Sequence, residues 1–145
     1  MTYSLADYIL TISNITQEFG LTNIQIGGQG SMTDSITANR NEDMYETEGD
    51  KTGGYVHNKS YNKTGLINIT LNQLSANVGK FKTLCNVYHR AAVQQGFTVT
   101  LTDTEGNIIV TANDCMPKGI PEQAFGQTAA TQTWVLTCGI IEFND

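Results

Sequence analysis

The sequence predicts a mainly β fold, an antiparallel β-sandwich or partial barrel on which one α-helix packs at about 77–94. Three observations support this prediction. Short stretches of alternating apolar and polar residues recur along the chain, glycine-rich or polar turns separate them, and a single segment has helical spacing. At 145 residues the chain is long enough to bury a core. We therefore expect one domain over residues 1–145, with an extended loop or hairpin arm at about 39–60.

Four candidate strands lie in the first half of the chain, at residues 7–13, 23–26, 31–38 and 65–72. The second of them ends at a glycine cluster, 27–30. We interpret this cluster as a turn rather than a phosphate loop, because no Lys-Ser or Lys-Thr pair follows it.

The clearest strand, 65–72, has two different faces. Ile67, Ile69 and Leu71 form the apolar face. The opposite face carries no charge and consists of Leu66, Asn68, Thr70 and Asn72. Surfaces that only meet water are usually rich in Lys and Glu. A neutral, hydrogen-bonding face therefore favours contact with another chain.

The predicted helix opens the second half of the chain. Val78, Phe81, Leu84 or Cys85, and Tyr88 follow one another at spacings of three and four residues in one apolar stripe, which predicts packing on a sheet. Ser75 or Asn77 is expected to cap its first turn.

A hairpin and a final strand are predicted after the helix. Two alternating segments, 97–102 and 108–112, flank a polar turn at 103–107. A long, weakly structured connection, 117–133, then leads to a buried strand at 134–143. One face of that last strand is expected to contain Trp134, Leu136, Cys138 and Ile140.

The composition is acidic but poor in charge. The formal net charge is −6, and charged residues make up only 15% of the chain, against roughly a quarter in a typical soluble domain. Such a surface fits a self-assembling protein and a plain β domain equally well. The acidity argues against nonspecific nucleic-acid binding. We expect neither a signal peptide nor a membrane span, because no basic leader precedes an apolar run of ~20 residues.

The sequence predicts no enzyme, cofactor or metal site. Three widely spaced cysteines stand outside any CxxC motif, namely Cys85, Cys115 and Cys138. We expect them to be buried free thiols. His89 has no carboxylate or nucleophile near it in the sequence, and Asp103 and Glu105 are expected at an exposed hairpin tip.

Charges segregate into two neighbouring blocks. Residues 34–50 contain six acids and one base, and residues 51–96 contain six bases and no acid. Three interpretations stay open: pairing within a hairpin, pairing between copies, or two solvated faces. If the blocks pair between copies, the contact residues are Glu42, Asp43, Glu46, Glu48, Asp50, Lys51, Lys59 and Lys63.

The order of several short motifs resembles the tail tube proteins of contractile-tailed bacteriophages, the myovirus-type inner tail tube family. The resemblance covers nearly the whole chain. Its central motifs are Gly49-Asp50, Gly53 or Gly54, Asn58-Lys59-Ser60, Gly65, the alternating Ile67, Ile69 and Leu71, and Gln73-x-Ser75-x-Asn77. The flanking motifs are Tyr3-Ser4-Leu5-Ala6-Asp7 and Cys115-Met116-Pro117-Lys118 followed by Trp134.

This resemblance implies a tail-tube-like fold and a structural role in the virion. Six subunits would form a ring, and rings would stack into a tube through which DNA passes during ejection without specific binding. The implied partners are further copies of the chain and the tail sheath, baseplate and terminator proteins. Assembly would take place in the host bacterial cytoplasm, with no membrane involved. The residues themselves predict the strands and the helix, not the number six.

Two alternatives remain open. One is a tube subunit of a related contractile injection or secretion system, which uses a similar fold. The other is a monomeric β-sandwich binding module, which would stay monomeric at high concentration.

Overall fold

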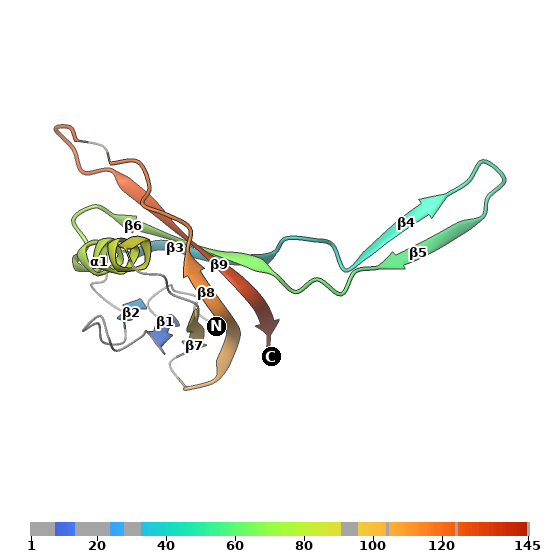
Figure 1. The fold of residues 1–145 in the computed structure, drawn as a ribbon, viewed down its shortest axis with the longest axis horizontal. Helices are drawn as coiled ribbons and strands as arrows, with labels where there is room; N and C mark the ends of the chain where they lie inside the picture. Colours follow the sequence, from blue (N-terminus) through green and yellow to red (C-terminus); the bar gives the residue numbers. More distant parts are fainter. Residues whose placement is uncertain are drawn as a thin grey trace.

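The computed structural model describes residues 8–13, 24–27, 33–90, 96–103, 105–123 and 125–144 (Figure 1). In these residues the chain is mainly antiparallel β with one helix, which confirms the predicted fold class. The elements are β1 Tyr8–Ser13, β2 Ile24–Gly27, β3 Thr33–Arg40, β4 Tyr45–Gly49, β5 Tyr55–Lys59, β6 Gly65–Asn72, α1 Ala76–Arg90, β7 Phe97–Asp103, β8 Ile108–Pro117 and β9 Thr131–Phe143.

Seven strands form one sheet in the order β2-β1-β7-β8-β9-β6-β3, and every neighbouring pair is antiparallel. The other two, β4 and β5, pair only with each other. Figure 1 shows that this second sheet extends away from the rest of the chain as a long arm. Within the predicted arm at about 39–60, β4 and β5 thus form a two-stranded hairpin. Residues 41–44 and 60–64, which have no helix or strand, connect it to the large sheet.

The core lies on the helix-covered face of the large sheet. In β6, Ile67, Ile69 and Leu71 are buried and alternate with half-buried residues, as the sequence predicts. Ile67 lies opposite Leu136 and Ile69 opposite Trp134 on β9, so two adjacent strands contribute the same apolar layer. Burying one such aliphatic side chain stabilises the fold by about 1.5–3 kcal/mol.

Helix α1 packs its predicted stripe onto this layer. The rings of Phe81 and Trp134 stack with centroids 5.5 Å apart, and Tyr88 meets Phe97 edge-on at 5.6 Å. Ser75 caps the first turn, because its Oγ accepts from the backbone N–H of Asn77 at 3.3 Å. The predicted last residues of the helix, 91–94, lie outside the described residues.

Gly65 lets two segments approach closely where β6 begins. A Cβ at this position would collide with the backbone carbonyl of Asn39 on β3 and with the side chain of Ile141 on β9. The close approach keeps the strands that lead into and out of the arm beside the end of β9. The glycine in the family-like motif therefore has a steric role.

The hairpin of β7 and β8 is confirmed, and its turn depends on one carboxylate. Asp103 accepts hydrogen bonds from the backbone N–H groups of Asn107 at 2.9 Å and Glu105 at 3.0 Å. These bonds, led by the one from Asn107, lower the pKa of Asp103 below its ordinary value. Asp103 therefore stabilises the turn, and this structural role explains why Asp103 and Glu105 lie close together in the sequence.

The prediction that Ile140 shares a buried face with Trp134 was wrong. Ile140 is 45% exposed, whereas Ile141 is fully buried. The reason is a kink beside Gly139, where the opposing Asp114 adopts a left-handed φ of 56° and the β8–β9 ladder lacks a pair. The alternation therefore shifts by one residue. The strand also begins at residue 131 rather than 134.

Residues 118–123 and 125–130 contain no helix or strand, in agreement with the predicted weak connection. Both ends of this segment are nevertheless fixed. Lys118 donates its N–H to the carbonyl of Val135 at 2.9 Å, and Ala130 exchanges bonds of 2.9 and 3.0 Å with Gln73.

Candidate assembly surfaces

The tip of the arm is organised by Asp50. One oxygen of its carboxylate accepts from Thr52 Oγ1 at 2.8 Å, Gly54 N at 2.8 Å and Thr52 N at 2.9 Å. Gly53, at a φ of 94°, supplies the left-handed residue that the turn requires. The bonds from Thr52 and then Gly54 lower the pKa of Asp50, so this carboxylate is ionised and engaged within its own loop.

The pairing of β4 with β5 sorts the arm into two chemically different faces. Glu46 lies opposite Asn58, and Glu48 lies opposite Val56. Because successive residues of a strand point to opposite sides, these four side chains share one face. We call it the acidic face.

The other side of the arm we call the aromatic face. Its members are Tyr45, Thr47, Tyr55, His57 and Lys59. The ring of Tyr55 lies 5.3 Å from that of His57, and the Lys59 ammonium lies 5.8 Å from the ring centroid of Tyr45 and 5.0 Å from that of Tyr61. Tyr55 is 72% exposed and Tyr61 82% exposed. Such large exposed rings mark an interaction surface.

The arm covers no apolar core of its own. Every side chain of β4 and β5 is exposed. An isolated two-stranded hairpin is only marginally stable in water, because too little apolar surface leaves the solvent. Packing against another chain would supply the burial that the arm lacks.

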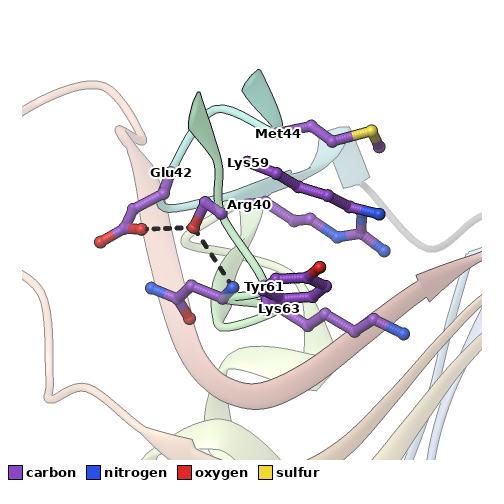
Figure 2. Close-up of a pocket in the computed structure, with 8 residues that line it drawn as sticks. Arg40, Glu42, Met44, Lys59, Tyr61 and Lys63 are labelled. Atoms are coloured by element: carbon purple, nitrogen blue, oxygen red, sulfur yellow. Dashed lines mark hydrogen bonds between the residues drawn. The ribbon is translucent and has the colours of Figure 1, made fainter. Parts of the chain in front are cut away.

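A pocket of about 400 Å³ lies where the arm joins the large sheet (Figure 2). In Figure 2 the side chains of Arg40, Lys59 and Lys63 extend to one side, whereas Glu42 extends to the other. Glu42 accepts from Ser60 Oγ at 2.8 Å. The remaining lining residues are Met44, Tyr61 and Asn62.

Only one of the three cations has no acid partner among the described residues. Lys63 Nζ lies 3.0 Å from Glu142, and the Arg40 guanidinium lies 4.0 Å from the same carboxylate. Arg40 also donates to the Ile141 carbonyl at 2.9 Å. Lys59, held over two tyrosine rings, is thus the cation best placed for a carboxylate from another chain.

The structure distributes the eight predicted contact residues over three places. Glu42, Asp43 and Lys63 lie at the base of the arm, Glu46, Glu48 and Lys59 along its two faces, and Asp50 and Lys51 at its tip. Both ion pairs in the described part use Glu142, which is not among the eight. Contact with a second subunit stays a prediction.

Sequence reasoning missed the aromatic face and the role of Glu142. The spacing of Tyr45, Tyr55 and Tyr61 looked irregular because the strands pair across a turn. Placing the turn at residues 50–54 would have revealed the shared face. Glu142 gave no local signal, because its partners lie more than seventy residues earlier in the chain.

A second surface is the outer face of the seven-stranded sheet, opposite the helix. Asn68 donates to Thr37 Oγ1 at 3.2 Å across β6 and β3, and the hydroxyls of Thr70 and Thr133 lie 3.2 Å apart across β6 and β9. Among the described side chains this face is mostly uncharged, and its charged member Glu142 lies opposite Thr111 near the end of β9. Its polar members are Thr11, Ser13, Ser35, Thr37, Asn68, Thr70, Thr98, Thr100, Thr102, Thr111, Thr131, Thr133 and Thr137.

The remaining features concern metal binding, membrane spanning, His89 and the 27–30 glycine cluster. Within the described ranges, no group of three or more His, Cys, Asp and Glu side chains could hold a metal ion. No helix in those ranges combines the length and apolarity needed to cross a membrane. His89 is exposed on α1. Three residues of the 27–30 glycine cluster, 28–30, lie outside the described residues.

A family model matches nearly the whole chain. The family model of the bacteriophage PhiTE tail tube protein matches residues 1–144. No curated protein matches the chain.

Solved structures show the same fold at low identity. The PVC sheath/tube terminator of an extracellular contractile injection system, in its extended state, has a TM-score of 0.57 and 12% identity, covering 100% of this chain and 98% of that chain. The PVC sheath-tube complex of an extracellular contractile injection system, in its extended state, has a TM-score of 0.55 and 13% identity. The match covers 99% of this chain and 93% of that chain. The tube-terminating cap of the anti-feeding prophage has a TM-score of 0.50 and 13% identity, covering 99% of this chain and 93% of that chain.

Proposed function

The chain belongs to the bacteriophage PhiTE tail tube protein family, and from this premise we propose that six copies form a ring and that rings stack into the inner tube of a contractile tail. Tail tube proteins are structural proteins, not enzymes. In this proposal residues 1–145 act as one domain, with the arm as its connector. The finished tube is a virion component, assembled in the host cytoplasm, and conducts DNA during ejection.

The main support for the proposal is that the arm has no apolar core of its own. All side chains of β4 and β5 are exposed, and large rings line one side. In a ring or stack, a neighbouring copy would cover one or both faces. The acidic face and the acids around it, Glu42, Asp43 and Asp50, would then meet bases such as Lys51, Lys59 and Lys63 of another copy.

Burial and charge would have separate roles in this contact. Exposed ion pairs contribute only ~0–1 kcal/mol each, so they set orientation and register. The rings of Tyr45, Tyr55 and Tyr61 would supply most of the affinity, since aromatic side chains dominate protein interfaces.

The threonine- and asparagine-rich centre of the outer face, away from Glu142 at the end of β9, suits the wall of a DNA channel. Lys or Arg there would bind phosphates and slow the passage, because phosphate contacts dominate nucleic-acid affinity. A wall of acids would instead raise an electrostatic barrier. Threonine and asparagine, as at Thr70, Thr133 and Asn68, do neither.

The proposed partners are the tail sheath, the baseplate and a terminator protein. The names of the similar structures, a sheath-tube complex, a sheath/tube terminator and a tube-terminating cap, support the first and last of these. Those names also favour a second candidate, a tube subunit of a contractile injection system that carries no phage head. The sheet wall would then face a cargo other than DNA.

Electron microscopy of the purified chain, together with sedimentation over a range of concentrations, tests the proposal. We expect six-membered rings or tubes with a central channel. A monomer at every concentration, without rings in micrographs, would favour a monomeric binding module instead. Deleting residues 43–61 and closing the gap with a short Gly-Ser linker provides the control, which should fold but not stack.

A further inference from the structure

Two of the three cysteines, distant in the sequence, lie side by side in the core. The register of β8 and β9 places Cys115 directly opposite Cys138. Their sulfur atoms are 3.1 Å apart, and Cys115 donates its S–H to Cys138. Cys115 is 0% exposed and Cys138 4% exposed. A disulfide bond has an S–S length of ~2.05 Å, so the sulfurs need to move by only about 1 Å.

The contact makes the two thiols chemically unequal. The hydrogen bond from Cys115 lowers the pKa of Cys138 and outweighs the opposing effect of burial. The same bond, together with burial, raises the pKa of Cys115. Cys138 is therefore the member of the pair that ionises first, and a thiolate is the reactive form of cysteine.

We propose that Cys138 and Cys115 form an oxidation site at which a peroxide creates a disulfide within one subunit. The Cys138 thiolate attacks one oxygen of hydrogen peroxide. An S–O bond forms, the O–O bond breaks, and the departing hydroxide takes a proton to become water. Cys138 is then a sulfenic acid.

Cys115 completes the reaction as the resolving thiol. Its sulfur attacks the sulfur of Cys138, the S–S bond forms, and the S–O bond breaks. The leaving hydroxide takes the proton of Cys115 and departs as a second water. Together the two sulfurs lose two electrons, which the peroxide gains.

A defect in the sheet beside both cysteines offers a route for the oxidant. Asp114 precedes Cys115 and has a φ of 56°, and Gly139 follows Cys138. The β8–β9 ladder pairs Asn113 with Ile140 and Cys115 with Cys138 but omits the residues between them. Local opening is easiest where backbone pairing is interrupted, and peroxide is small and uncharged.

Cys85 is an internal control in the same molecule. Burial raises its pKa to about 11, and its sulfur faces the carbonyl of Gly119 at 3.8 Å rather than another thiol. It therefore lacks both the lowered pKa and a resolving partner. This inference does not rest on the proposed function, because the site uses no contact between copies.

The experiment exposes the purified, reduced protein to hydrogen peroxide for increasing times and removes the excess with catalase. Remaining thiols are alkylated with iodoacetamide in denaturant, and the digest is analysed by mass spectrometry. We expect Cys115 and Cys138 to lose their thiols together, at least about tenfold faster than Cys85, and to appear in one linked peptide pair. The intact mass should fall by two hydrogen atoms.

Variants identify the roles of the two sulfurs without relying on a single substitution. Cys85→Ala should leave the linkage unchanged. Cys115→Ser removes the resolving thiol but keeps a hydrogen-bond donor beside Cys138, so the reaction should stop at a Cys138 sulfenic acid, which dimedone traps. The proposal is overturned if the wild-type pair stays fully alkylatable while Cys85 reacts, or if the linkage joins two different molecules. It is also overturned if, in the wild type oxidised briefly with dimedone present, the label is found on Cys115 rather than on Cys138.

Discussion

Thr47 and His57 lie opposite each other on the arm, and Oγ1 of Thr47 is 2.8 Å from Nδ1 of His57. This hydrogen bond joins the two strands on the aromatic face, between the rings of Tyr45 and Tyr55. The glutamates of β4 point to the other side. The two faces can therefore be tested separately, because substitutions on one leave the side chains of the other in place.

Reversing the acidic face should impair assembly without unfolding the subunit. We expect Glu46→Lys with Glu48→Lys to slow ring or tube formation or to shift its register. Both residues lie in the exposed arm, so the free energy of unfolding should change by less than about 0.5 kcal/mol. Light scattering during assembly, followed by micrographs, measures the effect.

The matched control makes the same charge change elsewhere, with Glu105→Lys and Glu122→Lys on exposed loops. Assembly of the wild type should also slow as salt reduces the Debye length from ~10 Å toward ~3 Å, because exposed pairs are screened. Normal rate, yield and length in the Glu46 and Glu48 variant would mean that the charge blocks are only solvated surface.

Removing rings from the aromatic face should weaken assembly more than reversing charges does. Tyr55→Ala removes an exposed ring, and aromatic residues at an interface often cost more than 2 kcal/mol when truncated. The expected result is a critical concentration raised by about tenfold or more. Tyr55→Phe keeps the ring and should assemble almost normally. Equal critical concentrations for Tyr55→Ala and Tyr55→Phe would show that the aromatic face does not lie in the interface.

Truncating the core layer should destabilise the subunit itself. Ile69 is fully buried against Trp134, and Ile69→Ala should lower the free energy of unfolding by about 2–5 kcal/mol. Leu66→Ala, on the half-buried outer face of the same strand, should cost less. Urea denaturation measures both, and a smaller loss at Ile69 than at Leu66 would contradict the assignment of faces.

Lowering the pH should disorder the tip of the arm. The hydrogen bonds to Asp50 lower its pKa below the ordinary value of 3.8. A depressed carboxyl pKa stabilises the folded turn above the unfolded value, and this contribution is lost as the pH falls through the folded one. The protection of the Thr52 and Gly54 amides, which is the slowing of their exchange relative to an unstructured chain at the same pH, should therefore fall only below about pH 4. Asp50→Asn should show little of this pH dependence.

The sequence predicted elements where local patterns decide the structure. Alternation in β6, helical spacing at Val78 and Phe81, and the turn at Asp103 all depend on residues close in the chain, and all were confirmed. The prediction was wrong at Ile140, because the kink opposite Asp114 shifts the alternation, and strict alternation was assumed through Gly139, which lies at this kink in β9.

The sites depend on long-range register, which a single sequence does not contain. The contact between Cys115 and Cys138 follows from strand pairing, and the same cysteines looked unrelated in the sequence. The neutral outer face was predicted for β6 alone. Its extension over β3, β9, β8, β7 and β1 required the strand order.

Placing positive charge on the outer face of the sheet should slow DNA passage while leaving the tube intact. Thr70 and Thr133 meet across β6 and β9 on this face, and neither contributes to the buried layer. In particles that carry Thr70→Lys with Thr133→Lys, lysines would line the proposed channel and bind passing phosphates, so ejection measured by dye release should slow. Raising the salt should restore much of the rate, because phosphate contacts weaken steeply with salt. Thr70→Gln with Thr133→Gln provides a control of comparable length without charge. Equal ejection rates for the lysine and glutamine particles, with tubes of normal length, would exclude this face as the channel wall.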